Sequence, residues 1–208
     1  MTLFPALFDI LQGVKPTKEG FRYLGVSFMR FATRILAFLT IAATASFAQL
    51  APEPQSADVP LMQDTTGAPM KMDFSLPLSG VSDPGILFSH FAKRNLLIYY
   101  FSPKCPHCQK HFPDVQNVMK EYESANVAGI AIAIGGNIKK NDIRMFIDQY
   151  KVVIPVFQDG SQKFGPAYGN GYVPVLYLVK PDGTFYRYES LDEAHMNHLR
   201  TMLNKIKK

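Results

Sequence analysis

The chain of 208 residues contains only two cysteines, Cys105 and Cys108, and just two residues separate them in the sequence CPHC. Two cysteines this close cannot supply a disulfide framework across a fold, and a structural zinc site takes four ligands. An apolar run of strand length, 95–101, precedes the pair, and a run with helical spacing of apolar residues, 109–123, follows it. The sequence therefore predicts a strand that leads directly into a helix, with both sulfurs at the start of that helix.

This placement favours exchange between a dithiol and a disulfide, because the free N–H groups and the positive dipole end of a helix start stabilise a thiolate. Cys105 is predicted to be the exposed attacking sulfur, and Cys108, one turn further on, to be shielded. Pro106 suits the first helical turn, where its missing N–H matters least. His107 and Lys104 can place positive charge near the attacking thiolate, which would lower its pKa and make the disulfide a better oxidant. A solvated loop position is the other interpretation of Lys104.

The N-terminal part of the chain has the pattern of an export signal. Arg30 and Arg34 form a positive region, an apolar stretch follows at 35–45, and small residues lead up to a predicted cleavage point after Ala48. The apolar stretch is shorter than the roughly 20 residues that a membrane-spanning helix needs. We therefore expect residues 29–48 to be a signal peptide, and we expect no stable membrane span after cleavage.

Two further segments flank this signal. Residues 1–28 are an uncertain extension, and because Met29 stands directly before the positive region, we interpret them as the product of a misassigned start. A genuine segment that docks as an amphipathic element is the alternative. Residues 49–70 are rich in Pro, Ala, Gln and Thr without helical or strand periodicity, and they are predicted to be a flexible linker.

The formal net charge of +5 is concentrated near the N-terminus. Residues 1–48 hold five Lys or Arg and two Asp or Glu, which leaves 17 basic and 15 acidic residues in the rest of the chain. No basic stripe with interleaved aromatic residues occurs in that rest, so a nucleic-acid partner is not expected.

Strand and helix patterns alternate from residue 71 onward, which predicts an α/β domain with a central mixed sheet flanked by helices. The turn sequence PDG at 181–183 predicts a terminal hairpin. The expected elements are a short edge strand at 72–78, a helix beginning at Asp83-Pro84 and including 86–91, strands at 127–134 and 152–157 around a helix at 140–150, hairpin strands at 175–179 and 184–188, and a final helix at 191–208.

This order of elements resembles the thioredoxin fold. Three stretches carry the resemblance: 73–78, the run through Cys108, and YVPVLYLVKPDG at 172–183. The additional strand and helix between the CPHC helix and the later proline resemble the TlpA/ResA-like periplasmic branch, whereas the CPHC sequence itself resembles that of the oxidase DsbA. The resemblance covers residues 71–208, which are predicted to form one thioredoxin-like domain.

The resemblance implies roles for residues outside the cysteine pair. Pro174 is expected to be a cis-proline that faces the pair, which leaves the backbone of Val173 free to bind an extended substrate segment; a trans proline that opens an edge strand is the alternative. Many relatives carry a buried acid where this chain has Tyr99. ResA-like relatives can carry a glutamate where this chain has His111, which could accept the proton of Cys108 or could be an ordinary surface histidine.

The family implies an exported thiol–disulfide oxidoreductase that exchanges the Cys105–Cys108 disulfide with client proteins and is recycled by a membrane or periplasmic redox partner. No cofactor or resident metal beyond this disulfide is expected. We favour a TlpA-like reductant in the periplasm or another exported compartment, with a DsbA-like oxidase or isomerase as the alternative. A copper(I) chaperone that uses both thiols with His107 and His111 is a further alternative. Peroxidase chemistry is disfavoured, because no Thr-x-x-Cys precedes the pair.

Overall fold

The computed structural model describes residues 56–208, so the predicted extension at 1–28 and the predicted signal at 29–48 lie outside the described residues. At its centre is a six-stranded mixed sheet with the order β1-β4-β3-β2-β5-β6. Strands β2, β3 and β4 are parallel to one another, and β1, β5 and β6 pair antiparallel with their neighbours. The strands are β1 (Ser79–Gly80), β2 (Asn95–Phe101), β3 (Val127–Ala133), β4 (Val156–Gln158), β5 (Val175–Val179) and β6 (Phe185–Tyr188).

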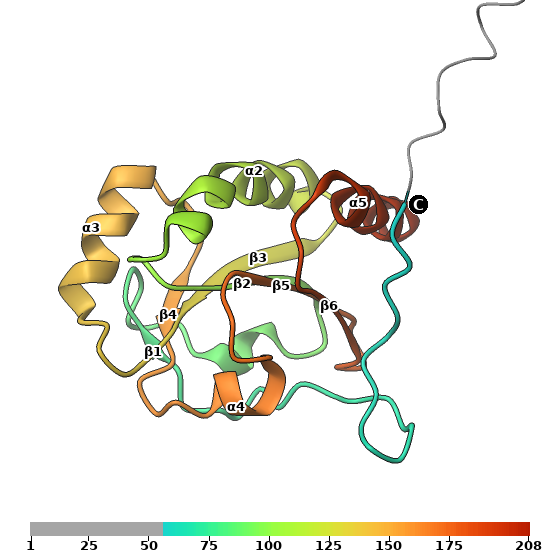
Figure 1. Ribbon diagram of the computed structural model, residues 1–208, viewed down its shortest axis with the longest axis horizontal. Helices are drawn as coiled ribbons and strands as arrows, with labels where there is room; N and C mark the ends of the chain where they lie inside the picture. The colour runs from blue at the N-terminus through green and yellow to red at the C-terminus, as the bar shows by residue number, and fades with distance from the viewer. Residues whose placement is uncertain (1–55) are drawn as a thin grey trace, which may run out of the picture. The chain divides into compact units, whose positions relative to one another are not determined.

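Helices cover both faces of this sheet, which confirms the predicted α/β architecture (Figure 1). The helices α2, α3 and α5 contribute to one apolar core, and α4 and the short 3₁₀ helix η1 contribute to the other. The helical elements are η1 (Phe88–Phe91), α2 (Pro106–Glu123), α3 (Lys140–Tyr150), α4 (Phe164–Tyr168) and α5 (Glu193–Lys207).

The position of β2 inside the sheet explains why its sequence is apolar without interruption. Alternate side chains of a strand point to opposite faces, and both faces here are covered by helices. Leu97, Tyr99 and Phe101 belong to the core under α2, whereas Leu96, Ile98 and Tyr100 belong to the core on the side of η1 and α4.

The parallel pairing of β2, β3 and β4 brings three loops to one edge of the sheet. Phe101 pairs with Ala133, and Ala133 pairs with Gln158, so these strands end side by side. The loop after β2 carries the cysteine pair. The loop after β3 therefore lies beside it, and the loop after β4 lies one strand further along the same edge.

The edge strand differs from the prediction at 72–78. Only Lys71 forms an isolated bridge there, with Thr184, and the strand that pairs with β4 is the later β1. The reason is local: the Asp73 carboxylate accepts the backbone N–H of Ser75 and turns the chain. Pro77 also has no N–H to donate to a ladder.

Two other elements differ from the prediction, and one helix was not predicted. The helix expected through 86–91 is reduced to the single turn of η1, because Gly85 weakens a helix and Lys93 adopts a left-handed φ of 62° just beyond it. The strand expected at 152–157 begins only at Val156, after Pro155. The five-residue helix α4 was not predicted, because one short turn has too few residues for a periodic signal.

The second half of the predicted linker is part of the folded domain, which corrects the expectation for 49–70. We name residues 56–63 the N-terminal strap. The Ala57 N–H donates to the Ala194 carbonyl at 3.1 Å, and the Met62 N–H donates to the Phe185 carbonyl at 3.0 Å. Val59 is 7% exposed and packs in the core under α5. These contacts join residues far apart in the sequence, so no local periodicity announces them.

We expect Val59→Ala to lower the free energy of unfolding by about 1–2 kcal/mol, because it removes two methyl groups from a buried position. Urea unfolding followed by circular dichroism measures this change. Val153→Ala is the matched control, since that valine side chain is 63% exposed and its truncation is expected to cost less than about 0.5 kcal/mol. Equal stability of Val59→Ala and the unmodified protein would show that the strap does not contribute to the fold.

Candidate active site

Cys105 and Cys108 lie where the sequence placed them, at the junction of β2 and α2. Cys105 is the residue just before the helix, with an extended backbone conformation, and Pro106 is the first helical residue, as predicted. The Cys105 N–H donates to the Ser102 carbonyl at 3.1 Å, which closes the turn between strand and helix. Both cysteines are free thiols; Cys105 is half-buried and Cys108 is 0% exposed. Only the first sulfur is therefore accessible to a partner.

The environment of Cys108 holds it as a thiol. Burial raises the pKa of Cys108 to about 12, although the Ser102 N–H, which donates to its Sγ at 3.5 Å, acts in the opposite direction. At neutral pH the thiol is then almost fully protonated. Cys108 must lose a proton before it can act as a nucleophile.

Tyr99 provides a neutral partner where many relatives carry an acid. It is 0% exposed, and its hydroxyl donates to the Cys108 carbonyl at 2.9 Å. Burial, with smaller contributions from Cys108 and Cys105, raises the pKa of Tyr99 well above its usual range. The tyrosine hydroxyl thus holds the backbone of Cys108 in place. Because it is neutral, it is no base for the Cys108 thiol.

The loop before β5 faces the accessible sulfur. The Val173–Pro174 peptide bond is cis, as predicted. The Cys105 thiol donates to the Val173 carbonyl at 3.8 Å. β5 pairs directly with β2, and this pairing holds the loop beside the cysteine turn. Tyr172, which directly precedes Val173 and which sequence reasoning did not single out, is 77% exposed.

Lys104, predicted to be a cation near Cys105 or a solvated loop residue, is exposed and forms an ion pair. Its Nζ lies 2.9 Å from an Asp142 carboxylate oxygen at the start of α3. The same carboxylate accepts the backbone N–H of Lys139 at 2.9 Å. These two hydrogen bonds, the one from Lys104 first, lower the pKa of Asp142. Nothing in the local sequence around Lys104 indicates this partner, which lies 38 residues further along the chain.

The two histidines near the pair stand apart from its hydrogen bonds. His107 is exposed and His111 is half-buried. Within residues 56–208, no hydrogen bond joins His111 to Cys108, and the role of His111 as proton acceptor stays a prediction. Gln109, which the sequence did not single out, donates to the Pro103 carbonyl at 2.8 Å and braces the cysteine turn.

The described residues contain no cluster of side chains that could form a metal site. In the part of the chain that the structure describes, no three His, Cys, Asp or Glu side chains gather to hold an ion, so the copper(I) alternative has no ligand set beyond the thiol pair.

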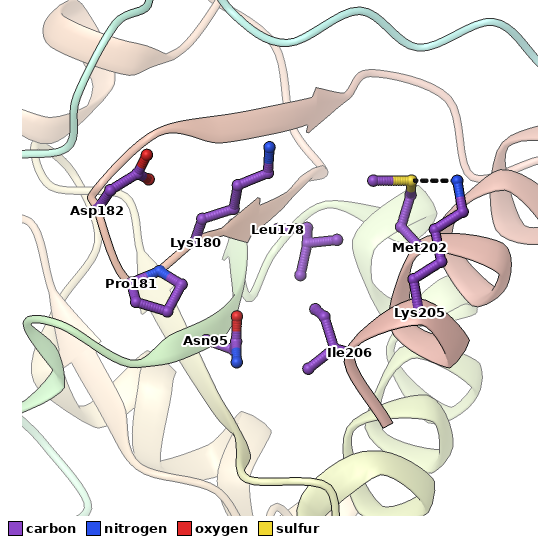
Figure 2. Close-up of a pocket in the computed structure, with 8 residues that line it drawn as sticks. All are labelled: Asn95, Leu178, Lys180, Pro181, Asp182, Met202, Lys205 and Ile206. Carbon is purple, nitrogen blue, oxygen red and sulfur yellow. Dashed lines mark hydrogen bonds between the residues drawn. The ribbon is translucent and has the colours of Figure 1, made fainter. Parts of the chain in front are cut away.

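A hollow of about 430 Å³ lies at the opposite end of β2 from Cys105 (Figure 2). Its lining is Asn95, Leu178, Lys180, Pro181, Asp182, Met202, Lys205 and Ile206.

Residues 48–187 match the AhpC/TSA family, which is more than half of the chain. The chain belongs to the AhpC/TSA family. Its curated relatives include the thiol–disulfide oxidoreductase ResA of Oceanobacillus iheyensis, 25% identical over 103 residues that cover 50% of this chain and 53% of the relative. ResA of Bacillus subtilis is 25% identical over 121 residues, 55% of this chain and 66% of the relative. The chain thus spans about half to two thirds of the length of these relatives.

Solved structures agree on the fold of this family member. A secreted disulfide oxidoreductase of Mycobacterium tuberculosis, described as homologous to E. coli DsbE, matches with a TM-score of 0.52 at 16% identity over 62% of this chain and 93% of that one. A thiol-disulfide oxidoreductase of Bacteroides fragilis matches with a TM-score of 0.51 at 20% identity over 62% and 98%. These identities support the shared thioredoxin-like fold, which confirms the predicted fold class.

We expect Cys108 in reduced Cys105→Ser protein to remain a thiol up to at least pH 10, because burial raises its pKa to about 12. A carbon-13 NMR titration of the labelled cysteine Cβ measures this. The same variant unfolded in urea is the control, where the thiol titrates near its ordinary value of about 9. Because the folded pKa is above the unfolded one, the reduced protein should also lose stability as the pH rises above about 9. A midpoint below 10 in the folded variant would contradict this assignment.

Proposed function

We propose that this AhpC/TSA-family protein is a thiol–disulfide oxidoreductase that exchanges electrons with client proteins through Cys105 and Cys108. One observation carries the proposal. A half-buried thiol at the start of α2 faces the Val173 carbonyl, and a second thiol one helical turn further on is fully buried. This asymmetry assigns the order of the steps, since only Cys105 can meet a client.

The reduced protein reacts in two steps. The Cys105 thiolate attacks one sulfur of a client disulfide, the client S–S bond breaks, and the other client sulfur leaves as a thiolate. Cys108 then loses its proton and attacks the Cys105 sulfur, which forms the Cys105–Cys108 disulfide and releases the second client thiolate. Two electrons pass to the client, and the two protons given up by the protein thiols end on the client thiols. The reverse sequence donates the disulfide.

The second step is expected to be the slower one at neutral pH. Burial keeps Cys108 protonated, and the neutral Tyr99 hydroxyl beside it is no base. The scarcity of the Cys108 thiolate therefore limits the step, and its rate should rise with pH.

The names of the relatives and the Lys104–Asp142 pair support a reductant over an oxidase, and the N-terminal sequence supports export. The curated relatives are named ResA, and the N-terminal sequence before the domain has the pattern of an export signal. Within residues 56–208, no helix is long and apolar enough to cross a membrane. Asp142 also pairs with Lys104 and so offsets one of the two cations that favour an oxidising poise. The CPHC sequence keeps the oxidase or isomerase role as the alternative. In either role, client proteins and a membrane or periplasmic recycling protein are the proposed partners.

Single cysteine substitutions test the assignment of the two thiols. Cys105→Ser should abolish reduction of insulin disulfides, whereas Cys108→Ser should accumulate a mixed disulfide with the client, because the resolving sulfur is lost. Mass spectrometry with and without dithiothreitol detects this adduct, and the doubly substituted protein is the control that forms none. Normal turnover by Cys105→Ser would overturn the assignment of the attacking sulfur.

The reduction potential of the Cys105–Cys108 pair tests the direction of electron flow. We expect a value closer to that of thioredoxin, about −270 mV, than to that of DsbA, about −120 mV. Equilibration with glutathione redox buffers, followed by alkylation of the free thiols, gives the potential. A value near −120 mV would favour the oxidase. N-terminal sequencing of the exported chain tests the compartment and is expected to begin at Gln49.

A further inference from the structure

Exposed basic side chains lie on the loops that follow three parallel strands, at the sheet edge that carries the accessible thiol. We call this group the basic edge, and Figure 1 shows α3, which carries part of it, beside the loop between β2 and α2. The exposed members are Lys104 after β2, Lys139, Lys140 and Arg144 after β3 and at the start of α3, and Lys163 after β4.

Backbone hydrogen bonds hold these three loops together. The Ile134 N–H donates to the Phe101 carbonyl at 2.8 Å, which joins the loop after β3 to the end of β2. The Asp159 N–H donates to the Ala133 carbonyl at 2.9 Å, which joins the loop after β4 to the end of β3. The Lys104–Asp142 ion pair then ties α3 to the residue before Cys105. The loops that carry the basic edge are therefore joined at one edge of the sheet.

Acidic side chains on the same loops offset only part of this charge. Asp142 is paired with Lys104. Asp159 is 1% exposed, and its oxygens accept the N–H groups of Lys163 and Gly165. The adjacent start of α2 adds the exposed Lys110 and carries no acid before Asp114. Among the described residues, Lys139, Lys140 and Arg144 form no ion pair.

The charge of the basic edge contrasts with that of the domain as a whole. Residues 56–208 contain 17 basic and 14 acidic side chains, so the excess on the α3 side of Cys105 comes from their placement. The segment after β6, on the other side of β2, carries the exposed acids Glu189, Asp192 and Glu193. A one-sided field at a reactive group raises the rate at which partners of opposite charge arrive, by about 10- to 1000-fold in strongly steered cases. A partner suited to this field carries its own excess of carboxylates near the sulfur that Cys105 attacks.

We propose that the basic edge selects client polypeptides whose disulfides are flanked by acidic residues. This inference rests on the proposed thiol–disulfide exchange at Cys105, because a disulfide-bearing partner must reach that sulfur. The basic edge acts mainly on the association rate and is weakened by salt, since exposed charges are screened over about 8–10 Å at ordinary ionic strength.

Three disulfide-bridged peptides of equal length test the selection, with Glu, Ser or Lys on both sides of each cysteine. The full chain in its reduced form is mixed with each peptide, and the second-order rate of peptide reduction is measured at low and at high salt. Each rate is divided by the rate at which dithiothreitol reduces the same peptide, which removes differences in the intrinsic reactivity of the disulfides. The Ser peptide reports the exchange chemistry alone.

Two charge-matched variants separate a local effect from a change in net charge. Lys139→Gln/Lys140→Gln/Arg144→Gln removes three positive charges from the basic edge. Lys205→Gln/Lys207→Gln/Lys208→Gln removes three from the end of α5, near the hollow at the opposite end of β2. Asp142→Asn removes the carboxylate that pairs with Lys104 and so adds to the positive field.

We expect the unmodified protein to reduce the Glu peptide about tenfold faster than the Ser peptide at low salt, with a ratio near one in about 1 M salt. The triple variant of the basic edge should lower the ratio of the Glu-peptide rate to the Ser-peptide rate at low salt to within about twofold of one. The α5 variant should leave this ratio unchanged, and Asp142→Asn should raise it. Equal rates with the Glu and Ser peptides, or equal losses in both triple variants, would overturn the selection while leaving the exchange reaction intact. Failure to reduce the Ser peptide would overturn the proposed function and this inference with it.

Discussion

The parallel pairing of β2 with β3 determines the geometry of the candidate site. Its register runs without interruption from Asn95 opposite Val127 to Phe101 opposite Ala133. Because both strands end at the same level, the cysteine turn and the loop that leads to α3 emerge side by side. On its other side β2 pairs with β5, which brings the Val173 carbonyl to the Cys105 sulfur. One strand therefore positions the nucleophile, the loop it faces and the neighbouring charges.

The chemistry of the site follows from unequal burial of two thiols that are one helical turn apart. Cys105 precedes α2 and reaches the surface, whereas Cys108 lies under the first turn of the helix against Tyr99 and Ser102. Burial disfavours a thiolate, so the second sulfur is protected from outside reagents and depends on a proton acceptor. A tyrosine at this position provides shape and a hydrogen bond without a negative charge. The pair thus places one sulfur at the surface and keeps the other inside the fold.

Local patterns predicted the parts of the structure that depend on neighbouring residues. The uninterrupted apolar run of β2, the CPHC helix start and the VPV sequence around Pro174 each carry their own signal, and the structure agrees with all three. The Lys104–Asp142 pair could not be predicted, because it depends on how α3 packs beside a turn 38 residues earlier. The edge strand was misplaced because the Asp73 turn competes with an otherwise strand-like composition. The strap at 56–63 resembled a linker, because its order comes from long-range contacts with Phe185 and Ala194.

The N-terminal strap also changes how much of the sheet edge is exposed. A free sheet edge presents a row of unpaired N–H and C=O groups that can capture any extended polypeptide. Leu61 bridges to Tyr186, and Met62 bonds to Phe185, so the strap occupies part of the β6 edge (Figure 1). At the other edge, β1 is only two residues long. With one edge partly covered and the other short, adventitious strand addition by an unfolded polypeptide is disfavoured at both ends of the sheet.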